Sequence, residues 1–351
     1  MKIITKDKAF DLAYKLLTSA NVDSQNSQAV ATHLVEAELA GYPSHGLLRL
    51  AQYLSEIRLG NVIPNVQPLI VEKGSFIDID GMWGLGQVTA SIATQKAIEI
   101  ANRIGVAIVT IQRCNHIGRL ESYTRHIANQ NQIGLMCVNG HGRSARVAAW
   151  QGCVPVLHTN PLSIAVPTQS DPLVLDMSTS AVAEGKVKFH YINNLPIPEG
   201  WLVDAQGETT TDASVLYQEP PGALLPFGGV SGYKGFGLSL MIDILAGALS
   251  GAGTTRSFGS SGHRGNGVFL CVINIAHVRD VGDYLSEVQD FILRIRNNAN
   301  PTNKINVRLP GDNYFKNRCQ KMMEGIAISD RDWERLEQEA KLWDFSIDSL
   351  L

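Results

Sequence analysis

The sequence lacks most of the short motifs that identify common enzyme classes. It has no complete G-x-G-x-x-G, since Gly84-Leu85-Gly86 and Gly251-Ala252-Gly253 both lack the third glycine and neither leads from a strand into a long helix. This absence argues against a Rossmann nucleotide fold. There is also no Walker A loop and no G-x-S-x-G, which argues against P-loop enzymes and α/β-hydrolases. The histidines form no H-x-x-x-H pair, so no metal site is predicted.

Cysteines, excess charge and long apolar runs are also scarce. The five cysteines are an odd number without a C-x-x-C pair, which predicts free thiols in a reducing compartment. A net charge of -3 gives no reason to expect nucleic acid or an anionic membrane as partner. No apolar run approaches the roughly 20 residues of a membrane span. The N-terminus leads directly into an amphipathic helix rather than a signal peptide, so the cytoplasm is the expected location.

The order of predicted elements indicates a mixed α/β fold. A chain of 351 residues is too long for one compact core and predicts two domains. Apolar periodicity predicts helices over the first sixty residues, capped by Thr5 and by Asp23 or Ser24. Strands are predicted around residues 77–80 and at 106–111, 135–138, 163–166, 173–176 and 268–275. Helices are predicted at 88–103, 236–247, 281–298 and after Ser329, and the helix at 236–247 is expected to be buried on most sides.

The most informative segment is Pro43-Ser44-His45-Gly46-Leu47-Leu48-Arg49. Ser44 is a favourable N-cap, and the apolar residues that follow repeat with helical spacing. On such a helix His45 and Arg49 lie one turn apart and share a face. Arginine fixes a carboxylate through two parallel hydrogen bonds, and imidazole exchanges a proton near neutral pH. The pair points to an enzyme acting on a small 2-oxo or 2-hydroxy acid, although a capped surface helix explains the pattern equally well.

Several loops of small residues adjoin the predicted strands and helices. They are Asn115-His116-Ile117-Gly118, His158-Thr159-Asn160-Pro161, Asp176-Met177-Ser178-Thr179-Ser180 with Lys186 just beyond, Tyr233-Lys234-Gly235-Phe236-Gly237 and Leu309-Pro310-Gly311-Asp312. Backbone amides of such loops bind phosphate, and lysines neutralise it. The same residues are favoured in ordinary turns, so each loop alone is more often a turn than a binding site.

In combination and in this order, these segments resemble the malate/L-lactate dehydrogenase family of the second type. That family also includes ureidoglycolate, sulfolactate and hydroxycarboxylate dehydrogenases, diketogulonate reductase and cyclic ketimine reductases. The resemblance covers nearly the whole chain and rests on Ser-His-Gly, Asn-His-x-Gly, Thr-Asn-Pro, Asp-Met-x-Thr-Ser, Lys-Gly-x-Gly-Leu and Pro-Gly-acid. It implies NAD or NADP bound on a non-Rossmann mixed sheet, which agrees with the missing fingerprint. It also implies a homodimer with the site near the subunit contact.

The resemblance assigns roles to the candidate catalytic residues. His45 matches the histidine that acts as acid or base in several members, with Ser44 beside it, and Arg49 matches the residue on the substrate carboxylate. His116 matches a histidine assigned to substrate contact or to proton transfer, so either imidazole could deliver the proton. We favour His45, because Arg49 on the same helical face would place the carboxylate close by. Asp176 either holds an imidazole in the required tautomer or caps the segment that follows.

The resemblance also implies the cofactor contacts and the division of the chain. The implied cofactor contacts are His45, Thr159, Asn160, Pro161, Val174, Leu175, Asp176, Met177, Ser178, Thr179, Ser180, Lys186, Lys234, Gly235, Leu309, Pro310 and Gly311. Residues 73–309 are expected to form the nucleotide-binding domain. Residues 1–72 are expected to pack with 310–351 in a helical domain.

Three features depart from the family pattern. After Asn139 the family has a Ser/Pro-containing loop that touches substrate, whereas this chain has Gly140-His141-Gly142-Arg143-Ser144. Gly140 and His141 are therefore candidate contacts for a different or more anionic substrate, although a solvent-exposed loop is equally consistent. Asp312 replaces the more usual Glu, and the loop at 256–266, with Arg256, His263 and Arg264, could close over the site.

These observations give one leading hypothesis and two alternatives. The leading hypothesis is an NAD(P)-dependent oxidoreductase that moves a hydride between nicotinamide and C2 of a small 2-hydroxy or 2-oxo acid. One alternative is a cyclic ketimine reductase, which acts on a C=N bond. The other is a catalytically silent relative that serves as a binding or scaffolding protein, which the altered loop at 140–144 slightly favours.

Overall fold

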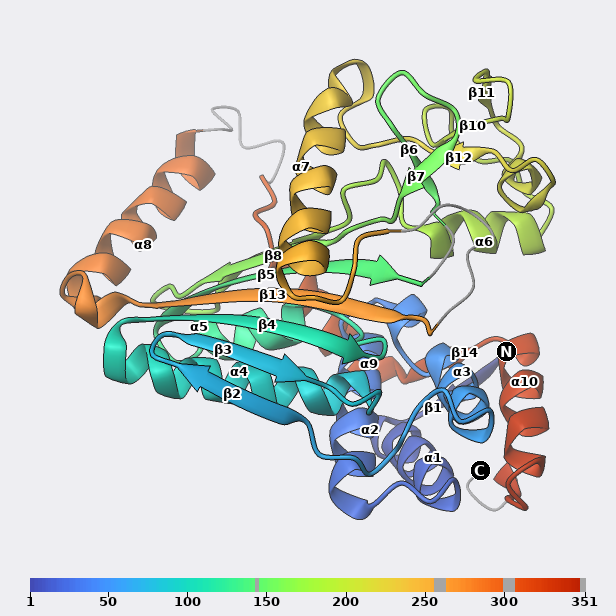
Figure 1. The fold of residues 1–351 in the computed structure, drawn as a ribbon, viewed down its shortest axis with the longest axis horizontal. Coiled ribbons are helices and arrows are strands. Elements are labelled where there is room, and N and C mark those ends of the chain that lie inside the picture. Colours follow the sequence, from blue (N-terminus) through green and yellow to red (C-terminus); the bar gives the residue numbers. More distant parts are fainter. Residues whose placement is uncertain (143–144, 256–262, 299–306, 348–351) are drawn as a thin grey trace.

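A mixed seven-stranded sheet forms the centre of the computed structural model, which describes residues 1–142, 145–255, 263–298 and 307–347 (Figure 1). Its strands are β2 (Leu69–Lys73), β3 (Phe76–Asp80), β4 (Val106–Cys114), β13 (Gly265–Asn274), β5 (Gln132–His141), β8 (Leu162–Val166) and β9 (Leu173–Met177), in that spatial order. The β3–β4 pair is parallel and the other pairs are antiparallel. Because β13 inserts between β4 and β5, the sheet does not have the strand order of a Rossmann fold. The prediction of a mixed α/β fold is confirmed.

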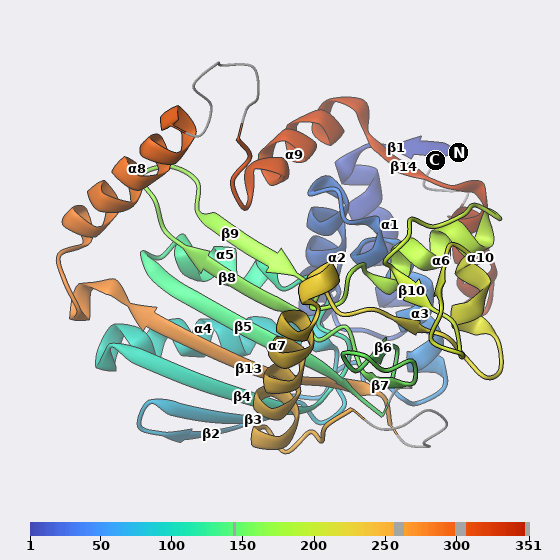
Figure 2. The same cartoon turned by 90° about the horizontal axis from the view of Figure 1, so that it is seen from above.

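Helices cover both faces of this sheet (Figures 1 and 2). On one face lie α4 (Gly86–Ile104) and α5 (Glu121–Ala128). The other face is crossed by α7 (Tyr233–Asp243), which continues as the π-helix η4 (Ile244–Leu249). Branched strand residues such as Ile79, Ile111 and Val268 form one core with Ala93 and Ala97 of α4. The small alanines let the helix approach the branched side chains closely, as native packing density requires.

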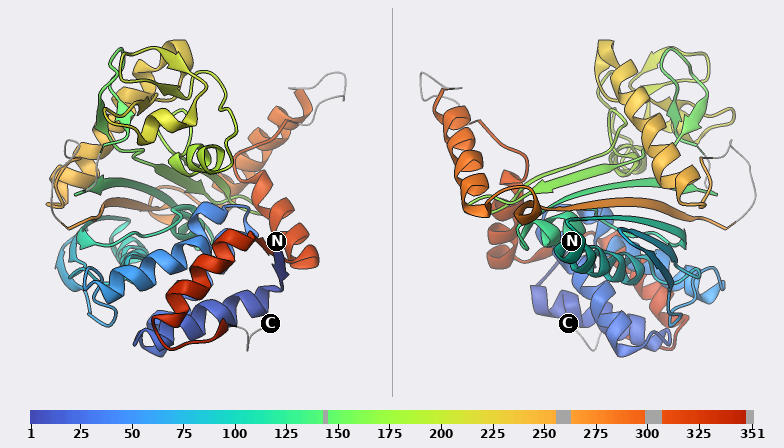
Figure 3. Two further views of the ribbon diagram at one scale, coloured as in Figure 1. Left: turned by 90° about the vertical axis from the view of Figure 1, so that its right-hand side faces the viewer. Right: turned by 60° about the vertical axis from the view of Figure 1, so that its left-hand side comes forward.

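The first and last segments of the chain pack together in a helical layer (Figure 3). Its elements are α1 (Lys6–Ser19), α2 (Ser24–Leu39), the 3-10 turn η1 (Pro43–His45), α3 (Leu48–Arg58) and α10 (Asp330–Lys341). The strand β1 (Lys2–Ile4) pairs antiparallel with β14 (Ile326–Ile328). Leu16 and Leu34 share one core with Trp333 and Leu336. Whether this layer is an independent domain stays a prediction.

The predicted caps of α1, α2 and α10 are confirmed. Thr5 accepts a hydrogen bond from the Lys8 N–H, and Asp23 accepts one from the Asn26 N–H. Ser329 likewise accepts from the N–H of Asp332. Each side chain satisfies one of the amides that a helix N-terminus leaves without an internal partner.

A smaller sheet and six further helical elements complete the described chain. The smaller sheet contains β11 (Thr209–Thr210), β10 (Leu202–Val203), β12 (Ala223–Leu224), β6 (Val147–Ala148) and β7 (Pro155–Leu157), next to α6 (Glu184–Ile192) and the turns η2 (Ala213–Tyr217) and η3 (Gly229–Ser231). After the turn η5 (Ile275–His277), α8 (Val281–Asn298) projects from the main sheet, and α9 (Asp312–Glu324) returns to α2 (Figure 3). Within the described ranges, no helix is both long and apolar enough to cross a membrane.

Two of the predicted helices differ from the structure. No α-helix begins at Ser44, because Gly46 adopts a non-helical conformation (φ -96°, ψ -144°) after the η1 turn, and α3 begins only at Leu48. His45 and Arg49 therefore do not share a helix face, and that prediction is wrong. The helix predicted at 236–247 begins at Tyr233. It is not buried on most sides, since Met241 and Ile244 face away from the sheet and are 55% and 44% exposed.

Candidate active site

Two histidines from distant parts of the chain face each other at one edge of the main sheet. His45 lies in η1, and His116 follows the end of β4. Their ring centroids are 5.8 Å apart and their planes differ by 23°. The loop that carries His116 is anchored by Asn266, whose side chain accepts a hydrogen bond from Ile117 N–H (3.1 Å) and donates one to Asn139 O (3.0 Å). The structure thus brings together the two imidazoles that the sequence singled out.

Arg49 remains close to His45 despite the broken helix. Its Nε donates to the backbone oxygen of Ser44 at 2.7 Å, and its Nη1 donates to Gln52 Oε1 at 2.8 Å. The hydroxyl of Ser44 lies 3.1 Å from His45 Nδ1. The side chain of Arg49 therefore folds back over the η1 turn, so that contact with Ser44, rather than helical spacing, places the guanidinium beside the imidazole.

His45 is neutral over the whole physiological pH range. It is partly exposed, yet the surrounding protein removes enough water to lower the pKa of His45 to about 3. The positive charge of Arg49 lowers this pKa further, followed by His33 and Arg119. Burial and a nearby cation both oppose the charged imidazolium. A neutral imidazole is the form that can accept a proton.

The orientation of His116 is fixed by two buried residues that the sequence reasoning missed. Gln87 Nε2 donates to the hydroxyl oxygen of Tyr53 at 2.6 Å, and this oxygen lies 2.7 Å from His116 Nδ1. Gln87 and Tyr53 are 1% and 4% exposed. Because the hydroxyl accepts from Gln87, its own proton is directed at His116 Nδ1. Neutral His116 then carries its proton on Nε2.

Asp176, the candidate partner of an imidazole, ends strand β9 beside the N-terminus of α5. Its Oδ2 accepts a hydrogen bond from the Glu121 N–H at 2.9 Å. Such a contact caps the helix and places a carboxylate at the positive end of its dipole. Enclosure by the protein raises the pKa of Asp176 to about 6, and the charge of Arg119 limits the rise. The role of Asp176 toward an imidazole stays a prediction.

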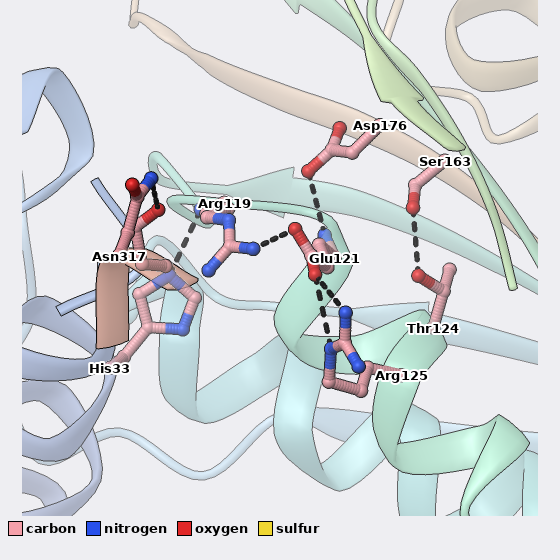
Figure 4. A network of polar contacts seen from close by, with 9 residues as sticks. His33, Arg119, Glu121, Thr124, Arg125, Ser163, Asp176 and Asn317 are labelled. Carbon is pink, nitrogen blue, oxygen red and sulfur yellow. Dashed lines mark hydrogen bonds and ion pairs between the residues drawn. The ribbon is translucent and has the colours of Figure 1, made fainter. Parts of the chain in front are cut away.

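A buried network of charged side chains lies behind this region (Figure 4). Glu121 forms ion pairs with both Arg119 and Arg125. His33 of α2 accepts a hydrogen bond at Nε2 from the Arg119 N–H (2.9 Å). Gly118 has φ +80°, and a Cβ there would lie 2.2 Å from His33 Nε2, so only glycine fits between His116 and this contact. The network therefore fixes the backbone immediately after His116.

The lowered pKa of His33 predicts how the stability of the fold depends on pH. Burial, followed by the charge of Arg119, lowers the pKa of His33 to about 3, so its stabilising contribution is full above the unfolded value near 6.5 and is lost as pH falls from there toward 3. Protonation of Nε2 would also break the bond to Arg119. In His33→Gln the amide oxygen can accept the same hydrogen bond but does not titrate. We therefore expect the free energy of unfolding of the variant to fall less steeply as pH decreases, by up to about 1.4 kcal/mol per pH unit.

Urea unfolding of wild type and variant at several pH values between 3 and 7 measures this difference. His277→Gln is the matched control, because His277 lies at the opposite end of β13. Identical slopes for wild type and the His33 variant would show that His33 is not the titrating group.

The segments predicted to hold a nucleotide contact one another, and α6 contacts the turn that carries His45. Thr179 N–H donates to Thr159 O at 2.9 Å, and Val174 N–H donates to Pro310 O at 3.3 Å. Asn160 Nδ2 reaches Ser239 O in α7 at 3.0 Å. At the N-terminus of α6, the Cβ position of Gly185 lies 3.2 Å from Ser44 Cβ. The structure thus joins the 159–161, 174–180 and 309–311 segments, with α6 and α7 at their border.

Of the remaining candidate residues, Gly140 and His141 lie at the same edge of the main sheet as the two histidines. His141 is 7% exposed and pairs with Gly265 across β5 and β13. Its ring centroid is 5.7 Å from that of Trp83, and the Cβ position of Gly140 is 2.8 Å from the His158 ring. Lys186 and Lys234 are exposed near the starts of α6 and α7. Arg143 and Arg256 lie outside the described residues. The ring of His263 stacks on that of Trp83, with 4.7 Å between the ring centroids.

Comparison with known proteins agrees with this geometry. The model of the malate/L-lactate dehydrogenase family matches residues 4–337. The chain belongs to this family of oxidoreductases. A malate dehydrogenase of Pyrococcus abyssi is 32% identical over 345 residues, which cover 96% of this chain and 94% of the relative. The predicted family resemblance is therefore confirmed.

Two solved structures extend the comparison. Sulfolactate dehydrogenase from Methanocaldococcus jannaschii has a TM-score of 0.87 at 28% identity and covers 99% of both chains. Delta1-piperideine-2-carboxylate reductase from Pseudomonas syringae has a TM-score of 0.83 at 27% identity, covering 97% of this chain and 100% of the other. The family fold is thus shared by proteins named for C–O and for C=N substrates.

Proposed function

We propose that this oxidoreductase transfers a hydride between a nicotinamide cofactor, NAD or NADP, and C2 of a small 2-hydroxy or 2-oxo acid such as malate or lactate. The observation that carries the proposal is the meeting of His45, Arg49 and His116 in a fold that also joins the segments at 159–161, 174–180 and 309–311. One cation, two imidazoles and a candidate nucleotide groove meet the requirements of this reaction class.

Arg49 serves as the carboxylate clamp in this proposal. It contacts Ser44 and Gln52 through Nε and Nη1, so an incoming carboxylate replaces Gln52 at Nη1 and uses Nη2 for a second hydrogen bond. A planar guanidinium binds a carboxylate in this two-pronged way. The acid group is then fixed next to His45, with the C2 oxygen in line with the outward-facing ring nitrogens of the two stacked imidazoles.

The two histidines divide the work on the substrate oxygen. Neutral His45 accepts the hydroxyl proton during oxidation and returns it during reduction. His116, held by Tyr53 with its proton on Nε2, donates a hydrogen bond to the same oxygen. The nicotinamide, when bound, supplies or accepts the hydride. The protein positions the substrate, exchanges its hydroxyl proton and stabilises its oxygen with a hydrogen bond.

The candidate cofactor segments fit a nucleotide in two respects. Asn160 Oδ1 and Ser239 Oγ are buried and have no hydrogen-bond partner within the described residues. Buried polar atoms of this kind are rare unless a ligand or water completes them. Lys234, in the first turn of α7, is exposed, and its charge together with the positive end of the helix suits a phosphate group. We infer NAD or NADP as the group that fits there.

Two further features remain proposals. A homodimer is inferred from the family resemblance. A location in the cytoplasm is inferred from the five cysteines, which include no C-x-x-C pair in the sequence. The exposed apolar side chains of Met241 and Ile244 on α7 and η4 support a covered surface in an oligomer.

A cyclic ketimine reductase is the second candidate, because the fold is shared with delta1-piperideine-2-carboxylate reductase. Assays with NADH and NADPH against a 2-oxo acid, a 2-oxo acid with methylamine, and a cyclic imino acid separate the two reactions. We expect turnover with the 2-oxo acid to exceed that with the cyclic imine. The reverse order would favour the ketimine reductase, and no fluorescence change on titration with either nucleotide would favour a silent relative.

Arg49→Lys tests the carboxylate clamp. We expect the KM for the 2-hydroxy acid to rise about tenfold or more with a smaller change in kcat, because lysine cannot reproduce two parallel hydrogen bonds. Steady-state kinetics at saturating nucleotide measures both constants. Arg58→Lys, in the last turn of the same helix, is the matched control. An unchanged KM in the Arg49 variant would remove Arg49 from substrate binding.

A further inference from the structure

A cavity of about 870 Å³ lies behind the catalytic pair, between helices α2, α4, α5 and α9. Its lining includes His33 and Glu36 from α2, Arg119 and Arg125 around the start of α5, and Arg318 from α9. Neither His45 nor His116 is part of this lining. The sequence analysis assigned no role to any of its arginines, and the proposed reaction uses none of them.

The two inner arginines are buried and incompletely paired. Arg119 and Arg125 are 3% and 8% exposed, and both turn to the single carboxylate of Glu121 (Figure 4). Within the described part of the chain, Arg119 Nε and Arg125 Nη1 donate no hydrogen bond. Arg318 is already paired with Glu36 at 3.2 Å. A buried guanidinium with an unused N–H is costly unless an acceptor completes it.

Aromatic rings hold both guanidinium groups in place without satisfying these N–H groups. The Tyr314 ring centroid lies 5.3 Å from Arg119 Cζ and 4.0 Å from Arg125 Cζ. The Tyr42 ring lies 4.4 Å from Arg119 Cζ. Contacts with an aromatic face leave the N–H edges of a guanidinium in its plane available for an acceptor. The rings therefore orient two cations in advance of binding.

We propose that this cavity binds an oxyanion, the phosphate or carboxylate group of a small molecule that is neither the substrate nor the nucleotide. The oxygen atoms of such a group accept hydrogen bonds from Arg119 Nε and Arg125 Nη1. Its negative charge also balances the second of the two guanidinium groups, which otherwise share the single carboxylate of Glu121. Arg119 is three residues from His116 and its N–H is bonded to His33, so the occupied cavity adjoins the catalytic loop. The inference does not rest on the proposed function.

Calorimetric titration of the full chain with inorganic phosphate, and separately with succinate, tests this site. The ionic strength is held constant, and chloride serves as the reference anion. We expect Arg125→Gln to weaken binding of the preferred anion about tenfold or more, since one charge-assisted hydrogen bond is lost. Gln28→Glu places a negative charge at the exposed wall of the cavity without disturbing the buried pairs, and should weaken binding several-fold. Gln206→Glu, in a turn of the smaller sheet, is the matched control and should bind as wild type does.

Three results would overturn the proposal. The first is the absence of binding of both phosphate and succinate to the wild-type protein. The second is unchanged affinity in both Arg125→Gln and Gln28→Glu. The third is loss of the binding signal when NADH or NADPH is saturating, which would assign the anion to the nucleotide groove. Binding that persists with nucleotide present and is weakened in both cavity variants supports a separate oxyanion site.

Discussion

His45→Ala is expected to lower kcat for oxidation of the 2-hydroxy acid by about 10²–10⁴, the usual effect of losing a general acid or base. The low pKa of His45, about 3, keeps the imidazole neutral at neutral pH, and a substrate carboxylate bound to Arg49 offsets a cation that otherwise opposes its protonation. Alanine removes the acceptor and leaves Arg49 in place, so KM should change much less than kcat. Added imidazole should restore part of the lost rate, because it can enter the space that the side chain leaves.

The controls separate His45 from its neighbours. His277→Ala removes an exposed histidine far from the sheet edge and should leave kcat unchanged. His116→Ala should reduce kcat less than His45→Ala, since His116 donates a hydrogen bond rather than taking the proton. Near-normal turnover of the His45 variant would remove this residue from the mechanism. A larger loss in the His116 variant, with rescue by imidazole, would exchange the two roles.

Glu121→Gln should destabilise the fold by about 3–5 kcal/mol, the typical result of leaving a buried ion without its counter-charge. Glu121 is 3% exposed and is the carboxylate shared by two buried arginines. Glutamine keeps the size of the side chain but removes the negative charge, so Arg119 and Arg125 repel each other in a poorly solvated place. Urea unfolding at pH 7 gives the change in the free energy of unfolding.

The matched control for this variant is an exposed ion pair. Glu287 lies 3.8 Å from Arg294, and their side chains are 67% and 63% exposed. Glu287→Gln should change the free energy of unfolding by less than about 1 kcal/mol, because exposed pairs contribute little. A Glu121 variant as stable as this control would show that the buried arginines obtain their stabilisation from other groups.

Much of the fold could be predicted from local sequence patterns. Side chains at Thr5, Asp23 and Ser329 cap helices as their residue types predict. Strand positions were also predicted, although β5 and β13 extend several residues further than expected. Apolar alternation marks the buried centre of a strand, whereas polar residues such as Asn139 and Asn266 continue the ladder through side-chain hydrogen bonds and do not follow that pattern.

The candidate site was only partly predictable, because much of it depends on contacts between distant segments. Gly46 separates the η1 turn from α3, so the helix expected from Ser44 begins only at Leu48, and the glycine between His45 and Leu47 was the available signal. Tyr53 was predictable as a residue on the inner face of α3, but its contact with His116 joins positions 63 apart. Gln87 lies in a helix that carries no functional signature, so nothing in its surroundings marked it as part of the site.

The pairing of Lys2–Ile4 with Ile326–Ile328 has a consequence for the order in which the protein acquires its structure. During synthesis α1 and α2 emerge first and can pack on each other, but Trp333 and Leu336, which complete their core, are translated nearly three hundred residues later. Closing so long a loop is slow. The apolar patch that Trp333 and Leu336 cover therefore stays exposed on the nascent chain until these residues leave the ribosome, and such a patch suits a chaperone that binds apolar helices.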